Sequence, residues 1–140
     1  RAVVPTLPSL DRRILSANLV DDALLLVRVS SALTGGEPAG RAVVEKLVTM
    51  KELSSSVKLI AAVSEDVDIL ERERYIWGVF TRFDCERDVV FTESKLAGIA
   101  PLYRGAMGID ATWKTGYPEP LTMTEGVAKR VDEQWGSLWK

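Results

Sequence analysis

Histidine is absent from this 140-residue chain, and cysteine occurs once, at Cys85. Without histidine, the chain lacks the commonest general base and the commonest ligand of transition metals. A Ser-His-Asp or Cys-His catalytic site is therefore excluded within these residues, and a structural zinc site is not expected. The single cysteine allows no internal disulfide and fits a reducing, cytoplasmic setting. Because no activating base stands near Cys85, we expect an inert thiol.

Long apolar runs and a strong charge imbalance are also missing. No run approaches the ~20 residues of a membrane-spanning helix, and no signal-peptide pattern is present, so we expect no membrane partner. The net charge of -2, with scattered basic residues, gives no basis for binding nucleic acid. The remaining composition, 46% hydrophobic and 27% charged, is typical of one globular domain. Because the chain begins with Arg1 and not Met, it is expected to be a fragment, a processed chain or one whose start is omitted.

Apolar runs alternate with helical stripes and predict one α/β domain over residues 1–140. The sheet should be mostly parallel or mixed, with flanking helices, because strand and helix patterns follow one another in turn. Two nearly continuous apolar runs indicate strands that are covered on both faces. The expected strands are 23–29, 57–63 and 88–92, and the expected helices between them are 38–53 and 69–83.

The two ends of the chain carry different patterns. Residues 1–20 are interpreted as an extended N-terminal segment, with a short helix over 10–19. At the other end, Thr122 and Glu125 form a capping-box signature for a helix over 123–139. Its apolar stripe ends in two tryptophans, so this helix either folds back on its own domain or docks on another domain or subunit.

An acidic motif, Glu65-Asp66-Val67-Asp68, directly follows the second expected strand. Two aspartates at a strand end can hold Mg²⁺ or Mn²⁺ through carboxylate oxygens, as sites of phosphate transfer do. The more ordinary interpretation is a solvated loop in which Asp68 caps the next helix. The sequence favours the second interpretation, because no phosphate-binding glycine loop accompanies the motif.

Further charged residues follow the expected helix over 69–83. Arg82 and Arg87 alternate with Asp84 and Asp88. An arginine fork in this cluster can bind a carboxylate or phosphate. A salt-bridge network at the helix C-terminus is the simpler alternative, since cations are favoured there.

Two later segments complete the candidates. Lys114 lies near Asp110 in a glycine-rich stretch, where it serves either as a desolvated base or as a residue that fixes the loop. The segment 96–102 is interpreted as an apolar loop. Such loops line ligand pockets at the carboxyl ends of parallel strands, although covering the core is the plainer role.

Three of these segments together resemble the UbiD family of decarboxylases. The quoted motifs are Ser64-Glu65-Asp66-Val67-Asp68-Ile69, Ile76-Trp77-Gly78-Val79-Phe80-Thr81-Arg82-Phe83-Asp84 continuing to Arg87-Asp88, and Met107-Gly108-Ile109-Asp110-Ala111-Thr112 with Lys114. They occur in the family's order, and the resemblance runs from about Ala23 to the C-terminus. It corresponds to the family's C-terminal domain. Glu65 stands where the family often has Asp, and Cys85 where it often has Pro, which loosens the turn constraint there.

The resemblance implies an enzyme that reversibly decarboxylates aromatic or α,β-unsaturated acids. The residues of the second and third motifs are most similar to those of members that act on phenolic acids. It implies prenylated FMN, with a divalent metal (Mn²⁺ or Mg²⁺) and K⁺, bound by an upstream domain outside this chain. The catalytic residues would lie in that domain, so none is assigned here and no metal ligand is expected. Ile99, Pro101 and Leu102 resemble the pocket-facing segment. The final helix resembles a tail that latches onto a neighbouring subunit, which implies a homo-oligomer.

Two other functions stay open. The chain can be a non-catalytic assembly module with no pocket role. It can also be a small metal-dependent enzyme built on Asp66 and Asp68.

Overall fold

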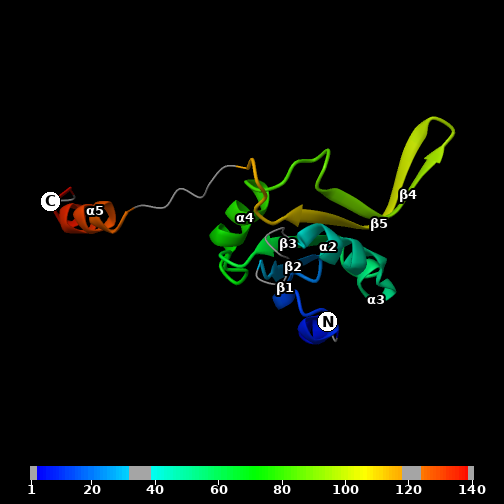
Figure 1. Ribbon diagram of the computed structural model, residues 1–140, viewed down its shortest axis with the longest axis horizontal. Coiled ribbons are helices and arrows are strands. Elements are labelled where there is room, and N and C mark those ends of the chain that lie inside the picture. The colour runs from blue at the N-terminus through cyan, green and yellow to red at the C-terminus, as the bar shows by residue number, and fades with distance from the viewer. Residues whose placement is uncertain (1–2, 32–38, 118–123, 139–140) are drawn as a thin grey trace.

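The centre of the computed structural model is a mixed five-stranded sheet with the strand order β1-β2-β3-β5-β4 (Figure 1). The structure describes residues 3–31, 39–117 and 124–138. β2, β3 and β5 are parallel, whereas β1 and β4 are antiparallel strands at the two edges. The strands are β1 (Ile14–Val20), β2 (Leu24–Val29), β3 (Leu59–Ser64), β4 (Val89–Ala97) and β5 (Ala100–Ala111).

Helices cover both faces of the sheet. On one face α2 packs against β3, β4 and β5, and on the other α4 packs against β3 and β5. Neighbouring residues of β3 enter opposite cores: Ile60 and Ala62 pack with α2, while Ala61 and Val63 pack with α4. The helices are η1 (Val4–Thr6), α1 (Leu7–Leu10), α2 (Gly40–Thr49), α3 (Lys51–Ser54), α4 (Arg72–Phe80) and α5 (Glu125–Leu138).

The predicted α/β class, with a mixed sheet, is confirmed. The apolar runs 23–29 and 57–63 are the parallel strands β2 and β3, and both are buried on two faces as expected. The predicted helix 38–53 is divided at Met50, whose ψ of 114° is extended, so α2 and α3 are separate helices. Its first predicted residue, Pro38, lies outside the described residues.

The N-terminal interpretation was wrong. The stretch expected to be a helix over 10–19 is mostly β1, which pairs with β2 through a tight turn at Asp21 and Asp22. Three residues separate the paired ends Val20 and Leu24; both aspartates have positive φ (49° and 55°), and Ala23 donates its N–H to the Val20 carbonyl at 3.0 Å. The segment before β1 is not extended, since η1 and α1 occupy residues 4–10. Its prolines sit in the first turn of each helix, where a missing N–H costs nothing.

The second half of the sheet also differs from the prediction. The apolar loop expected at 96–102 is a β-hairpin: β4 continues to Ala97, and β5 begins at Ala100. The third strand is therefore longer than 88–92 and antiparallel to its neighbour. The helix expected over 69–83 is shorter, because α4 begins at Arg72. Asp68 does not cap it; its carboxylate accepts the N–H of Leu70 at 2.9 Å.

The C-terminal helix exists as predicted and spans α5. It stands apart from the sheet in Figure 1. Val127, Val131 and Trp135 on its apolar stripe are 44%, 41% and 58% exposed. Thr122 of the expected capping box and Trp139 lie outside the described residues. Within the part of the chain that is described, no helix combines the length and apolar character needed to cross a membrane.

Candidate functional site

The carboxyl ends of β3 and β5 lie side by side and bring the charged motifs together. β3 pairs with β5 up to Val63 and Ala111, and the main chain stays close beyond that point, where Trp113 donates its N–H to Ser64 Oγ at 2.7 Å. The C-terminus of α4 and the segment before β4 reach the same edge. We call the cluster there the carboxyl-edge network; its members are Asp66, Arg82, Asp88, Asp110, Lys114 and Tyr117.

Arg82 and Asp66 form its first pair. The guanidinium donates two parallel hydrogen bonds to the carboxylate, at 2.8 and 2.7 Å, and Arg82 is 1% exposed. It also lies 5.3 Å from the ring centre of Trp77. Hydrogen bonding from Arg82 lowers the pKa of Asp66. Sequence reasoning expected Arg82 to pair with Asp84 or Asp88; the structure shows Asp66 as its partner instead.

Lys114 ties three segments together. Its ammonium donates to the carbonyls of Asp110 (2.8 Å), Thr112 (2.9 Å) and Arg82 (3.4 Å). The carboxylates of Asp88 and Asp110 lie 3.5 and 3.6 Å away. The predicted proximity of Asp110 and Lys114 is thus confirmed. Since all three ammonium hydrogens have acceptors, the geometry matches a lysine that fixes its loop and not one that attacks a substrate.

Asp88 and Tyr117 form the outer part of the network. The Tyr117 hydroxyl and the Asp84 N–H both donate to Asp88 Oδ2, the latter at 2.8 Å. Burial alone would raise the pKa of Asp88, but the hydrogen bonds from Tyr117 and Asp84 and the charge of Lys114 outweigh it and lower the pKa. Burial and the nearby Asp88 raise the pKa of Tyr117 to about 12. Tyr117 was not singled out from the sequence, although an aromatic residue in a glycine- and proline-rich stretch was a usable signal.

The carboxylates of the acidic motif already accept hydrogen bonds, which limits their chemistry. Asp66 is held by Arg82 and Asp68 by a backbone N–H, so neither presents a free pair of oxygens to a cation. No group of three or more potential metal ligands occurs in the described ranges. Three buried nitrogens, Arg28 Nε, Arg82 Nε and Trp113 Nε1, have no hydrogen-bond partner among the described residues. The arrangement braces one edge of the sheet.

The three residues predicted to face a pocket lie at the opposite end of β5. Ile99, Pro101 and Leu102 occupy the hairpin tip and its first strand residues, and Ile99 is fully exposed at 100%. The hairpin does not meet the carboxyl-edge network, and a shallow hollow in the structure lies elsewhere, beside η1 and the β1–β2 turn. That hollow is lined by Val4, Pro5, Leu19, Asp21 and Asp22, whose apolar and acidic side chains do not suit a flavin phosphate. The residues that line this hollow therefore do not fit prenylated FMN.

These features define an α/β domain whose charged edge is structural. Residues 2–111 match the C-terminal domain of 3-octaprenyl-4-hydroxybenzoate carboxy-lyase, and the chain belongs to this UbiD C-terminal domain family. The resemblance stated from the three motifs is thereby confirmed.

Solved structures share the fold. Vanillic acid decarboxylase from Sedimentibacter hydroxybenzoicus, in closed form, is similar with a TM-score of 0.68 and 17% identity, covering 99% of this chain and 31% of that chain. An evolved dimeric form of the UbiD-class enzyme HmfF from Pelotomaculum thermopropionicum, in complex with prFMN, is similar with a TM-score of 0.61 and 20% identity. The match covers 91% of this chain and 27% of that chain. Apo 3,4-dihydroxybenzoic acid decarboxylase from Klebsiella pneumoniae is similar with a TM-score of 0.57 and 13% identity, and the match covers 93% of this chain and 31% of that chain. This chain spans less than a third of each of them.

Proposed function

We propose that this chain is the C-terminal domain or small subunit of a UbiD-like decarboxylase or carboxylase of aromatic acids, phenolic acids in particular, that works in the cytoplasm. The family match over residues 2–111 carries this proposal. The described residues hold no group of three or more potential metal ligands, and the chain has no histidine, so we assign the reaction itself to a separate domain or subunit. Alone, the chain is inactive.

The cofactor and metal belong to that upstream domain in this proposal. Prenylated FMN would supply the electron sink for loss of CO₂ there, with Mn²⁺ or Mg²⁺ and K⁺ at its phosphate. The carboxyl-edge network supports the arrangement indirectly. By holding β3, α4 and β5 in fixed relation, it gives the domain one rigid shape to present to its partner.

The exposed hairpin is the part of the chain proposed to shape the substrate pocket. Ile99 and Leu102 are apolar residues with 100% and 38% exposure, and Pro101 lies between them. Apolar side chains in such numbers on a projecting element favour burial against a partner. Closing one wall of an apolar pocket would bury them and would suit an aromatic substrate.

The second proposed role is assembly through α5. Its exposed stripe repeats at the i, i+4, i+8 spacing of Val127, Val131 and Trp135, which buries one face when a helix docks. Trp135 alone offers an anchor of about 200 Å². We assign this face to a neighbouring subunit of the same enzyme.

The test uses the complete enzyme, loaded with prenylated FMN, and follows CO₂ release from a hydroxybenzoate. Ile99→Asp and Leu102→Asp are expected to raise KM or lower kcat at least tenfold. Leu70→Asp, at a 77% exposed leucine away from the hairpin, is the matched control outside both the proposed pocket wall and the arm. Unchanged turnover in the two tip variants would remove the pocket role.

Assembly is tested separately by Val131→Asp and by deletion of residues 135–140, with sedimentation velocity as the measurement. Both are expected to reduce the oligomer to smaller species. If α5 variants dissolve the assembly while the tip variants keep full turnover, the chain is a non-catalytic assembly module. Release of CO₂ by this chain alone, without a companion domain, would contradict the proposal as a whole.

A further inference from the structure

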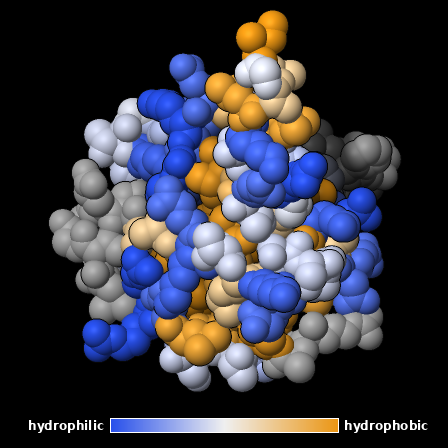
Figure 2. All heavy atoms as spheres, turned by 90° about the vertical axis from the view of Figure 1, so that its right-hand side faces the viewer, coloured by the Kyte–Doolittle hydropathy of each residue, from blue (hydrophilic) through white to orange (hydrophobic). Residues whose placement is uncertain are grey.

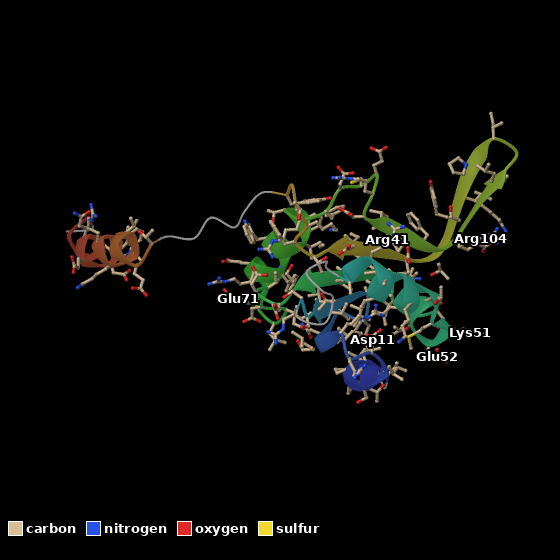
Figure 3. All side chains as sticks on the ribbon, viewed as in Figure 1. Asp11, Arg41, Lys51, Glu52, Glu71 and Arg104 are labelled. Carbon is tan, nitrogen blue, oxygen red and sulfur yellow. The ribbon has the colours of Figure 1, made fainter. Side chains whose placement is uncertain are left out.

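The outer half of the β4–β5 hairpin projects beyond the rest of the sheet. We call residues 93–104 the arm; Figure 1 shows it extending from the body, and Figure 3 marks Arg104 where it leaves. The arm begins at a bulge, where the pairing register shifts between Phe91 and Glu93 and Gly105 adopts a φ of 82°. β4 is the last strand in the sheet order, so its outer edge pairs with no described strand.

Hairpin geometry decides which backbone groups face outward from this edge. Ala97 and Ala100 flank a two-residue turn whose first residue, Gly98, has a φ of 65°, as a type II′ turn requires. The pair that flanks such a turn exchanges hydrogen bonds, and bonded pairs then alternate along the strands. Glu93, Lys95 and Ala97 therefore bond to β5. Ser94 and Leu96 direct their N–H and C=O groups to the open side.

Two such edges can join in antiparallel fashion only in registers that place outward residues opposite one another. With Ser94 opposite its own copy, Glu93 faces Lys95 of the second copy and Lys95 faces Glu93. Shifting the pairing by one step toward the N-terminus places Glu93 opposite Glu93, and the shift the other way places Lys95 opposite Lys95. Like charges directly opposite one another destabilise a strand pair. Charge complementarity thus selects one of three neighbouring registers.

We propose that two copies of this chain pair through β4 across a two-fold axis at Ser94, which extends the sheet from one subunit into the next. Within one chain, Lys95 Nζ already lies 2.9 Å from Glu93 Oε1, with the two side chains 48% and 47% exposed. In the paired arms, each of these charges gains an opposite charge across the seam as well. The four charges then alternate around a square, with no like charges adjacent along or across the strands.

The apolar residues of the arm favour the same occupant. Leu96, which lies outside the proposed pocket wall, is 72% exposed. Figure 2, in which the arm faces the viewer, shows apolar atoms gathered at its projecting end. In the selected register Leu96 lies opposite Thr92 of the second copy, near the base of its arm. A lone lysine on an edge strand ordinarily discourages pairing. Here Glu93 lies two residues away, so Lys95 meets an opposite charge on the second copy in one register and thereby selects that register.

This inference rests on the assembly role proposed above and goes further by naming the surface, the axis and the register. It concerns β4, whereas the proposed docking of α5 uses a different element. The two contacts can therefore be broken one at a time in the complete protein.

Single cysteines read the register directly. In the complete protein with Cys85→Ser, the variants Glu93→Cys, Ser94→Cys and Lys95→Cys are compared under mild oxidation. The Cα atoms of a hydrogen-bonded antiparallel pair lie about 5.5 Å apart, within disulfide range, whereas diagonal neighbours lie about 7 Å or more apart. We expect a disulfide-linked dimer for Ser94→Cys only. Crosslinking at position 93 or 95 instead, or at none of the three in a protein that sedimentation shows to be oligomeric, overturns the proposal.

Charge reversal tests the same seam without a crosslink. Glu93→Lys and Lys95→Glu each place like charges across both halves of the seam and should raise the dissociation constant roughly tenfold. Because Arg104 lies opposite Glu93 within the hairpin, all four proteins are made in an Arg104→Gln background. There the double variant Glu93→Lys/Lys95→Glu restores alternation across the seam and should recover the constant of the parent protein, which also shows that the arm still folds. Equal constants for all four proteins contradict the inference. If they are equal while α5 variants still dissolve the oligomer, the proposed function survives and only this interface fails.

Discussion

The two halves of β5 have opposite surroundings. Residues 106–111 lie between β3 and β4 and are almost entirely buried, with α2 on one face and α4 on the other. Residues 100–105 pair with β4 alone and are all exposed. One continuous strand thus serves as core at one end and as projecting surface at the other.

The difference separates what holds the domain together from what it offers to partners. The inner half ends in the carboxyl-edge network, where Asp110 and Lys114 join three segments of the chain. The outer half carries Ile99 and Leu102 at its tip, with no described segment packed over them. Substitutions in the inner half should therefore reduce stability, and those in the outer half should change association or turnover.

The sharpest contrast within β5 is expected from Ile109→Ala and Leu102→Ala. Ile109 is 3% exposed, so removing its side chain leaves a cavity and should lower the free energy of unfolding by about 3–4 kcal/mol. Leu102 is 38% exposed, and its truncation should cost less than about 1 kcal/mol. Urea unfolding of the two variants measures both losses. Similar losses would show that the outer half belongs to the folding core.

A smaller effect is expected at the network. Asp66→Ala leaves the buried Arg82 guanidinium without its carboxylate, and a broken buried ion pair costs up to about 3–5 kcal/mol. The Asp66 side chain is itself 52% exposed, and solvated ion pairs contribute less to stability than buried ones. We therefore expect Asp66→Ala to lower the free energy of unfolding by about 2 kcal/mol. Asp68→Ala is the matched control in the same motif and should cost at most about 1 kcal/mol. Equal losses in the two variants would argue against Arg82–Asp66 as the pair that braces this edge.

The parts of the fold predictable from sequence were those with a one-dimensional signature. β2 and β3 are buried on both faces, so they appear as continuous apolar runs. β5 was missed because its glycines and its proline suggested loops. The structure gives Gly108 a packing reason instead, since a Cβ there would lie 2.2 Å from Val44 Cγ1. That crowding depends on a helix sixty residues earlier, which no local pattern reveals.

The site was predictable only in part for a similar reason. Three charged motifs were expected to matter, and the structure brings them to one edge because β3 and β5 are parallel neighbours. Their pairing could not be read from spacing. Arg82 has acidic neighbours at positions 84 and 88 in the sequence, yet its hydrogen bonds go to Asp66, where the chain has turned back across the sheet edge. Proximity in sequence favoured Asp84 and Asp88 as partners of Arg82, but the Arg82 side chain at the end of α4 points to Asp66 instead.

The smallest predicted effect tests the outer part of the network through its pH dependence. The folded pKa of Tyr117 is raised to about 12, above the ordinary value of 10.0, because burial and Asp88 favour the neutral phenol. A raised pKa means that the stabilisation by Tyr117 is complete below about pH 10 and is lost as the pH rises through about 12.

Tyr117→Phe removes the hydrogen bond to Asp88 and should cost about 1 kcal/mol at neutral pH. The difference between wild type and Tyr117→Phe in urea unfolding should therefore stay constant from pH 7 to about 9 and shrink above about 10. Tyr103→Phe, at an exposed tyrosine of the arm, should differ little from wild type at every pH. A Tyr117→Phe loss near zero at neutral pH would show that the phenol does not stabilise Asp88, and a loss that stays constant to about pH 11 would contradict the raised pKa of Tyr117.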